Sequence, residues 1–253
     1  VHVQSYGWQN AVKDGAVSGT SGQAKRLEAI TVKLTGSIAD DYDVYYRTHV
    51  QTYGWLGWAK NGEKAGSATA SKRMEAIEIK LVKKGEDAPE STGNAYKCPL
   101  VGYQTHMQSY GWRSKEYDNA VNGVTGKSKR MEALKISLPD VEGTTGYTGG
   151  IAYQVYVQGN GWQDWKSDGQ LAGTTGKSKR IEALRVKLTG EVAEYYDVYY
   201  RVYLARIGWS AYVCGGDDAL AGSMNLSKRI EAMKIKLVKK GDTPPSTAGT
   251  TYL

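Results

Sequence analysis

The chain has 253 residues, of which 40% are hydrophobic and 23% are charged, a balance typical of globular proteins. No apolar run approaches the roughly 20 residues that a membrane-spanning helix needs, so we expect no membrane insertion. Two cysteines are too few for a disulfide framework or a cysteine-based metal site. The net charge of +7 directs attention to anionic partners, either nucleic acid or acidic glycans.

The first feature along the chain is a Gly-Trp pair that recurs every ~50 residues, a period typical of stacked supersecondary units. The tryptophans of these pairs are Trp8, Trp55, Trp112, Trp162 and Trp209. Each pair is followed by a cationic pair, a glutamate, an alanine and an alternating apolar run. These five segments are residues 24–34, 71–81, 128–138, 178–188 and 227–237. The pattern predicts five units that share a core.

A longer period groups the five units. Residues 35–47 match residues 189–201, and residues 81–93 match residues 237–249. The latter two stretches are rich in Pro, Ser, Thr and Gly and read as linkers. We therefore predict two domains: residues 1–96, with two repeats that form an incomplete threefold unit, and residues 97–253, with three that form a complete one.

Each repeat is predicted to consist of strands. In the fourth, residues 153–162 alternate in polarity, a short strand runs through Trp165, and residues 167–176 carry glycines suited to turns with positive φ. In the last strand, the side chains of Leu184 and Val186 point to one face and that of Arg185 to the other. The predicted fold is all-β with pseudo-threefold symmetry and resembles a β-prism, with a β-trefoil as the alternative.

The cationic pair and the glutamate belong to this last strand. Arg180 and Glu182 have the same parity as Leu184, so in a strand that is regular back to Arg180 both charges face the apolar side. Because an unpaired charge at the rim of a core is costly, we expect the two side chains to form a structural ion pair.

The motif resembles a known family. The string "HVQSYGWQ" (residues 2–9), Asp14-Gly15, Gly19-Thr20 and Arg26 to Ala29 together resemble the ChW repeat, the clostridial hydrophobic repeat with a Gly-Trp pair. The resemblance implies a secreted or cell-surface protein that binds a substrate, glycan or partner, and it assigns no catalytic residue. The fifth repeat departs from the pattern, because it reads "LARIGW" (residues 204–209) and lacks the glutamine.

Catalysis is not expected. An enzyme needs one set of catalytic residues, whereas the glutamate of the motif occurs five times. No hydrolase, zinc-protease or phosphate-loop motif occurs in the sequence. His2, His49 and His106 share one repeat position that Tyr156 and Tyr203 fill elsewhere. The sequence therefore implies no metal and no cofactor.

The aromatic residues supply the candidate binding site. We expect the five Gly-Trp tryptophans to be buried in the core, as structural residues. Three positions later, each repeat varies between Ala, Lys and aromatic residues, which is typical of a surface. The candidate ligand-binding residues are Trp58, Trp165 and Tyr212, with the polar neighbours Gln51, Gln158 and Asp168.

Two function classes remain open. The first is a non-catalytic, lectin-like carbohydrate-binding or adhesion module that takes neutral or acidic glycans. The alternative is a cell-surface scaffold for protein partners. Nucleic acid is not an expected partner, because much of the basic charge would be paired with the repeated glutamates.

The cysteines leave two alternatives. Cys98 precedes the first strand of the three-repeat piece and Cys214 lies in its last repeat, so ring closure would bring them together as a disulfide. The other alternative is two unrelated thiols.

Overall fold

The computed structural model describes residues 1–90 and 93–252. With 41% strand and 5% helix, the protein is all-β, as predicted. It divides into two compact units, the first of which is Val1–Cys98 and the second of which begins at Pro99. The boundary thus falls after Cys98 rather than after residue 96. The choice between a β-prism and a β-trefoil stays a prediction.

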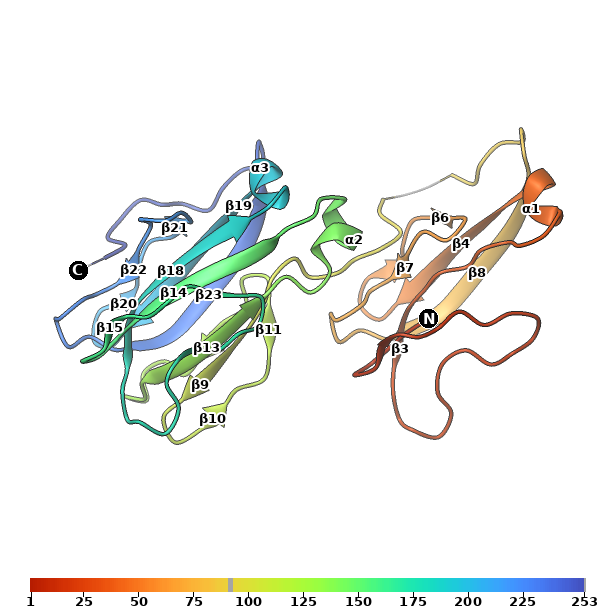
Figure 1. Cartoon of the computed structure of the whole chain (residues 1–253). Coiled ribbons are helices and arrows are strands. Elements are labelled where there is room, and N and C mark those ends of the chain that lie inside the picture. Colours follow the sequence, from red (N-terminus) through yellow and green to blue (C-terminus); the bar gives the residue numbers. More distant parts are fainter. Residues whose placement is uncertain (91–92, 253) are drawn as a thin grey trace. The chain divides into compact units, whose positions relative to one another are not determined.

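Among its described residues, the first unit contains two sheets (Figure 1). One has the order β2-β1-β3-β7, and in the other β4 pairs with β5, β6 and β8. Its elements are β1 (His2–Val3), β2 (Gly7–Trp8), β3 (Leu27–Ile30), α1 (Ile38–Asp41), β4 (Tyr42–Val50), β5 (Gly54–Trp55), β6 (Ala59–Lys60), β7 (Ala65–Gly66) and β8 (Met74–Lys83).

Within residues 99–252, the second unit contains three sheets, with the central orders β10-β9-β13-β17, β15-β14-β18-β22 and β12-β23-β19-β20. Figure 1 shows the long strand pairs β14–β18 and β19–β23. Its elements are β9 (Gly102–Met107), β10 (Gly111–Trp112), β11 (Glu116–Tyr117), β12 (Asn122–Gly123), β13 (Met131–Ser137), α2 (Val141–Thr145), β14 (Gly150–Val157), β15 (Gly161–Trp162), β16 (Lys166–Ser167), β17 (Ala172–Gly173), β18 (Ile181–Thr189), α3 (Val192–Tyr195), β19 (Tyr196–Leu204), β20 (Gly208–Trp209), β21 (Val213–Cys214), β22 (Ala221–Gly222) and β23 (Ile230–Lys239).

One repeat shows how sequence alternation becomes structure. In the fourth, β14 pairs along its length with β18, so that Val155 faces Leu184 and Tyr153 faces Val186 on the core side. All four side chains are fully buried. The buried Tyr153 hydroxyl donates a hydrogen bond to the carbonyl of Gln170. A tyrosine therefore fills the core here and also satisfies a backbone carbonyl, which a phenylalanine could not do.

The repeats exchange strands. β7 of the second repeat joins β3 of the first, β17 of the fourth joins β13 of the third, and β22 of the fifth joins β18 of the fourth. β12 of the third joins β23 of the fifth, which closes the three-repeat unit into a ring. One core cluster accordingly takes residues from all three repeats of that unit.

At each junction, a glycine of the incoming two-residue strand lies opposite the alanine of the Glu-Ala pair in the strand that accepts it. We call this residue the donor glycine. The register is the same at all four junctions: Gly66 faces Ala29, Gly173 faces Ala133, Gly222 faces Ala183 and Gly123 faces Ala232. A Cβ on any of these glycines would lie 2.3–2.6 Å from the carbonyl oxygen of the acceptor glutamate. The four glycines also have φ between +100° and +130°, so both conformation and space require glycine.

The predicted linkers are not simple spacers. Their distal ends fold back onto the last repeat of each unit, where the amides of Gly66 and Gly222 donate to the carbonyls of Ala95 and Thr251. Within the part of the chain that the structure describes, no helix is long and apolar enough to cross a bilayer.

Candidate functional site

The five Gly-Trp tryptophans lie outside the core. Trp8 and Trp55 are 37% and 43% exposed, and the other three are half-buried, so the prediction that they are buried core residues is wrong. The hairpin register explains this result. Trp162 pairs with Tyr156, whose side chain points to the face opposite Val155 and Val157. Because directly paired residues share a face, the indole lies on the outer side of the sheet.

Each of these indoles contacts two further groups. Its edge or face meets the ring of the paired His or Tyr in a T-shaped contact, at centroid distances of 5.4–5.6 Å. A cation lies over each ring as well, and the closest is Arg185, with its guanidinium carbon 4.4 Å from the Trp162 centroid. Such stacking fixes the indole and places positive charge beside it. The outer face of every repeat therefore carries an aromatic–cation stack.

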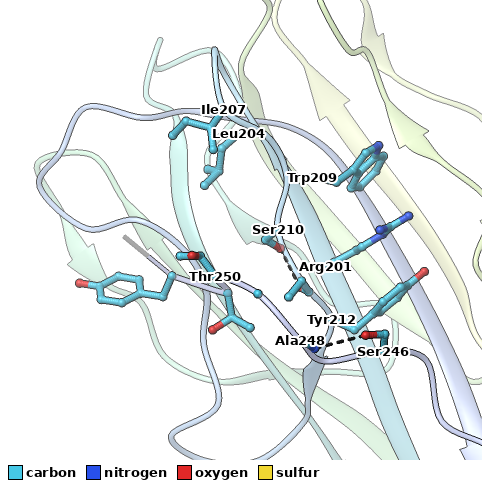
Figure 2. A pocket seen from close by; sticks show the side chains of 13 residues that line it. Arg201, Leu204, Ile207, Trp209, Ser210, Tyr212, Ser246, Ala248 and Thr250 are labelled. Atoms are coloured by element: carbon cyan, nitrogen blue, oxygen red, sulfur yellow. Dashed lines mark hydrogen bonds between the residues drawn. The ribbon is translucent and has the colours of Figure 1, made fainter.

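In three stacks among the described residues, the cation also lies over a second aromatic ring. Lys64 lies 5.7 Å from the Trp8 centroid and 5.5 Å from that of Tyr96. Arg47 lies 4.9 Å from the Trp55 centroid and 4.8 Å from that of Trp58. Its counterpart Arg201 lies 4.8 Å from Trp209 and 4.6 Å from Tyr212. Figure 2 shows the Arg201 guanidinium between the two rings.

Two pockets adjoin these stacks in the second unit. The larger, of about 520 Å³, lies beside Trp209 and is walled on one side by residues 246–252 of the folded-back C-terminal segment. The other, of about 460 Å³, lies beside Trp162 and is lined also by Gln163, Asp164, Lys166, Leu171 and Gly173. It combines an indole with an amide, a carboxylate and an amine.

The Gln163 side chain is already bound to the donor strand. Its Oε1 accepts a hydrogen bond of 2.7 Å from the amide of Gly173, and its Nε2 donates to the carbonyl of the same residue at 3.4 Å. The Gln163 side chain is therefore engaged within the protein, whereas Asp164, which also lines the pocket, is exposed to solvent.

The predicted ligand-binding residues do not form one groove. Trp58 and Trp165 are half-buried and contact Arg47 and Lys187. Tyr212 is only 8% exposed, because it packs with Tyr199 and Val238, so its predicted exposure is wrong. Its hydroxyl donates to Asn119.

The polar neighbours lie apart. Gln158 follows β14, whereas Asp168 approaches the start of the same strand, where its carboxylate accepts from the amide of Ile151 at 3.4 Å. The length of β14 separates them by roughly 20 Å at 3.3 Å per residue. Gln51 occupies the position of Gln158 in the second repeat. The backbone amides of these two residues donate to the backbone carbonyls of Arg73 and Arg180, respectively.

The arginine of the cationic pair and the glutamate form a binding site, which we call the socket, for the incoming strand. Arg180 Nη2 lies 2.7 Å from Glu182 Oε1, so the predicted ion pair is present. The other carboxylate oxygen accepts from the amide of Asn225, just beyond the donor glycine, at 3.3 Å. In the first three repeats a histidine Nδ1 also lies 3.2–3.3 Å from the glutamate. This role in strand exchange was not predicted from the sequence.

Within residues 1–90 and 93–252, neither Cys98 nor Cys214 forms a disulfide, so the disulfide alternative is wrong. Cys98 is buried in the first unit, with its Sγ 3.3 Å from the Thr69 hydroxyl, whereas Cys214 is an exposed residue of β21 in the second. The two residues therefore belong to different units and not to one closure seam.

Several residues of the stacks escaped the sequence analysis. No binding role was predicted for three cations of the stacks, Arg185, Lys187 and Arg201. The alternation of their strands nevertheless places them on the same face as the tryptophans. Within residues 1–90 and 93–252, no group of three or more His, Cys, Asp or Glu side chains is placed to hold a metal.

Repeated sheets that complete one another by strand exchange define a class of all-β repeat protein. The chain belongs to the ChW family: the family model "Clostridial hydrophobic W" matches residues 2–36, 49–83, 106–140, 156–190 and 204–239. No curated protein and no solved structure gives a significant match.

Proposed function

We propose that the protein is a non-catalytic carbohydrate-binding or adhesion module that acts outside the cell or at its surface. The observation that carries the proposal is the pocket at Trp162, where a fixed indole adjoins Asp164 and Lys166. Sugar rings are bound through stacking on aromatic side chains combined with a few polar groups that fix orientation. The proposal thus places the binding site at the Gly-Trp motif itself and not at Trp165, one of the candidates from the sequence.

The charge around the pocket favours an acidic glycan. Arg185 lies over the Trp162 ring and Lys166 lines the pocket, so two cations stand against the one carboxylate of Asp164. Lys187, beside Trp165, is already paired with Asp217. A uronic acid or sulfated sugar would gain from this potential, and its binding would weaken as salt screens the charges.

The test is a glycan array of neutral and acidic oligosaccharides, followed by calorimetric titration of the best ligand. We expect Trp162→Ala and Lys166→Ala each to weaken binding by about tenfold or more, as for residues at the centre of an interface. Lys177→Ala, which removes the same charge from an exposed turn outside the pocket, is the matched control. Equal affinity of all three variants, at unchanged folding, would refute this site.

A second function is favoured by a separate observation. A scaffold for protein partners needs a contiguous apolar surface, and the first unit has one: Ile77, Ile79 and Leu81 of β8 are 38%, 53% and 49% exposed. This surface belongs to a different unit from the Trp162 pocket, so the two functions are compatible.

A further inference from the structure

The exposed strand β8 has buried counterparts in every repeat of the second unit. Ile79 corresponds to Ile136, Val186 and Ile235, all of which are fully buried. In the first unit, β8 pairs with β4, so that Ile79 lies beside Tyr46 on the same face. Side chains of the first repeat cover Tyr46, so the half of the sheet that contains β4 is shielded from solvent on this face. The β8 half is the part that a third repeat covers in the second unit.

The same strand carries an unfilled socket. Arg73 Nη2 lies 2.9 Å from Glu75 Oε1, and His49 Nδ1 lies 3.2 Å from Glu75 Oε2, as at the occupied sites. Yet the Glu75 side chain is 33% exposed, against 3–8% for the other four glutamates. Ala76 is exposed too, whereas its four counterparts are fully buried. Ala76 pairs with His49 of β4, but among the described residues no second strand pairs with it on the other edge of β8.

The first repeat carries the matching unused donor. Ser18-Gly19 corresponds to Asn122-Gly123, which pair with β23 in the second unit. Gly19 already has the donor conformation, with φ +110°. A Cβ on it would meet only the side chain of Leu27 at 3.8 Å, and the neighbouring Val17 is 84% exposed. The two-repeat unit thus presents one empty acceptor and one free donor.

We propose that this open face binds one further ChW repeat, of the kind formed by residues 99–149, through two strand exchanges. The incoming glycine would lie against Ala76, and Gly19 would lie against the Glu-Ala pair of the incoming repeat. The third repeat shows that one unit can make both contacts at once, because Ala133 accepts Gly173 while Gly123 enters the fifth repeat.

The ring size selects this occupant over a second copy of the chain. The second unit closes with three repeats and uses all its donors and acceptors, so it has none to offer. Another first unit would bring two repeats and make a ring of four, which the observed closure at three does not fit. A single repeat completes the ring and covers β8.

The experiment extends the full chain by a copy of residues 99–154 placed directly before Val1, since Val1 corresponds to Val155. Hydrogen exchange of the β8 amides and the fluorescence of a hydrophobic dye are compared between the parent and the extended chain. We expect the exchange to slow at least about tenfold, the dye signal to fall to background, and the extended chain to remain monomeric. Unchanged exchange and dye binding would overturn the proposal.

Two variants sharpen the test. Gly123→Val in the added copy alone places a Cβ against the acceptor backbone, and we expect it to abolish the protection of β8. Ile79→Ala should leave the unfolding of the parent unchanged and lower the unfolding midpoint of the extended chain. Protection that survives the first variant, or an equally neutral Ile79→Ala in the extended chain, would contradict strand exchange. If the parent itself dimerises and thereby protects β8, the occupant is a second copy and the proposal is wrong.

Discussion

At the scale of single residues, the Glu-Ala pair explains why the chain repeats the same short segment. The glutamate binds the arginine two positions before it and, at three of the four filled junctions, the backbone amide three residues beyond the donor glycine. The alanine leaves room for the donor glycine to approach within backbone contact. Charge pairing and small size are thus two requirements of one junction, and each repeat that accepts a strand must meet both.

This account predicts unequal effects of one substitution at two equivalent sites. Glu28→Ala removes a carboxylate that is only 4% exposed and leaves Arg26, whose side chain is 31% exposed, and the amide of Thr69 without their partner. We therefore expect a loss of about 2–3 kcal/mol of stability. Glu75→Ala removes a half-exposed pair with no strand attached, and we expect a loss of about 1 kcal/mol or less. Urea unfolding of both variants measures the difference. Equal losses would show that the carboxylate does not hold the exchanged strand.

Residue parity in the sequence placed Glu182 on the apolar side with Leu184, which would hold only for a regular strand. The register of β14 and β18 shifts at this point, so that Val157 pairs with Ile181 and Tyr156 with Ala183, and Ile181 is the residue that joins the core. The predicted face of Trp162 was also wrong, since the face of a short hairpin arm depends on its pairing register. The register follows from the turn at residues 158–160, which sets Gly161 opposite Val157. Recurrence of a large aromatic residue therefore did not distinguish a core position from an outer stack.

At the scale of elements, the two-residue strands could not be predicted from alternation. Residues 167–176 carry the expected positive φ at Gly169, Gly173 and Gly176. Their turn chemistry nevertheless contains β17, whose strand character comes wholly from pairing with β13 of another repeat. A strand of two residues has no period to detect, so exchange between repeats was invisible in the sequence.

The donor glycines allow this pairing to be tested against its own control. Gly19 and Gly66 both have positive φ, but only Gly66 faces an acceptor strand. We expect Gly19→Ala to cost about 1 kcal/mol for its backbone conformation alone. Gly66→Ala should cost about 2–4 kcal/mol, because the added Cβ also overpacks the junction.

Thermal unfolding of the two variants, followed by circular dichroism, measures these losses. The exchange would be of little energetic importance if Gly66→Ala were no more harmful than Gly19→Ala.

At the scale of the whole molecule, the two units differ in closure. The core of the second unit takes buried side chains from three repeats, whereas that of the first is small and leaves β8 uncovered. Because stability grows with the apolar surface that folding buries, the first unit should be the weaker one.

We therefore expect calorimetry to show two unfolding transitions. Glu28→Ala should lower only the first, and Glu182→Ala only the second, since each glutamate belongs to one unit. A single transition that both variants shift equally would show instead that the units unfold together.

The junction between Gly123 and Ala232 joins the first and last repeats of the second unit, and it has a consequence for how the protein is made. A ribosome releases the third repeat well before the fifth, so the donor strand of the third repeat must wait until almost the whole unit has been synthesised. Contacts between distant parts of a chain form slowly, and the apolar surfaces of such intermediates favour aggregation. The apolar faces of β13, β18 and β23 are covered only when the ring closes. They are therefore exposed during translation, and this is the stage at which we expect chaperones to bind the chain.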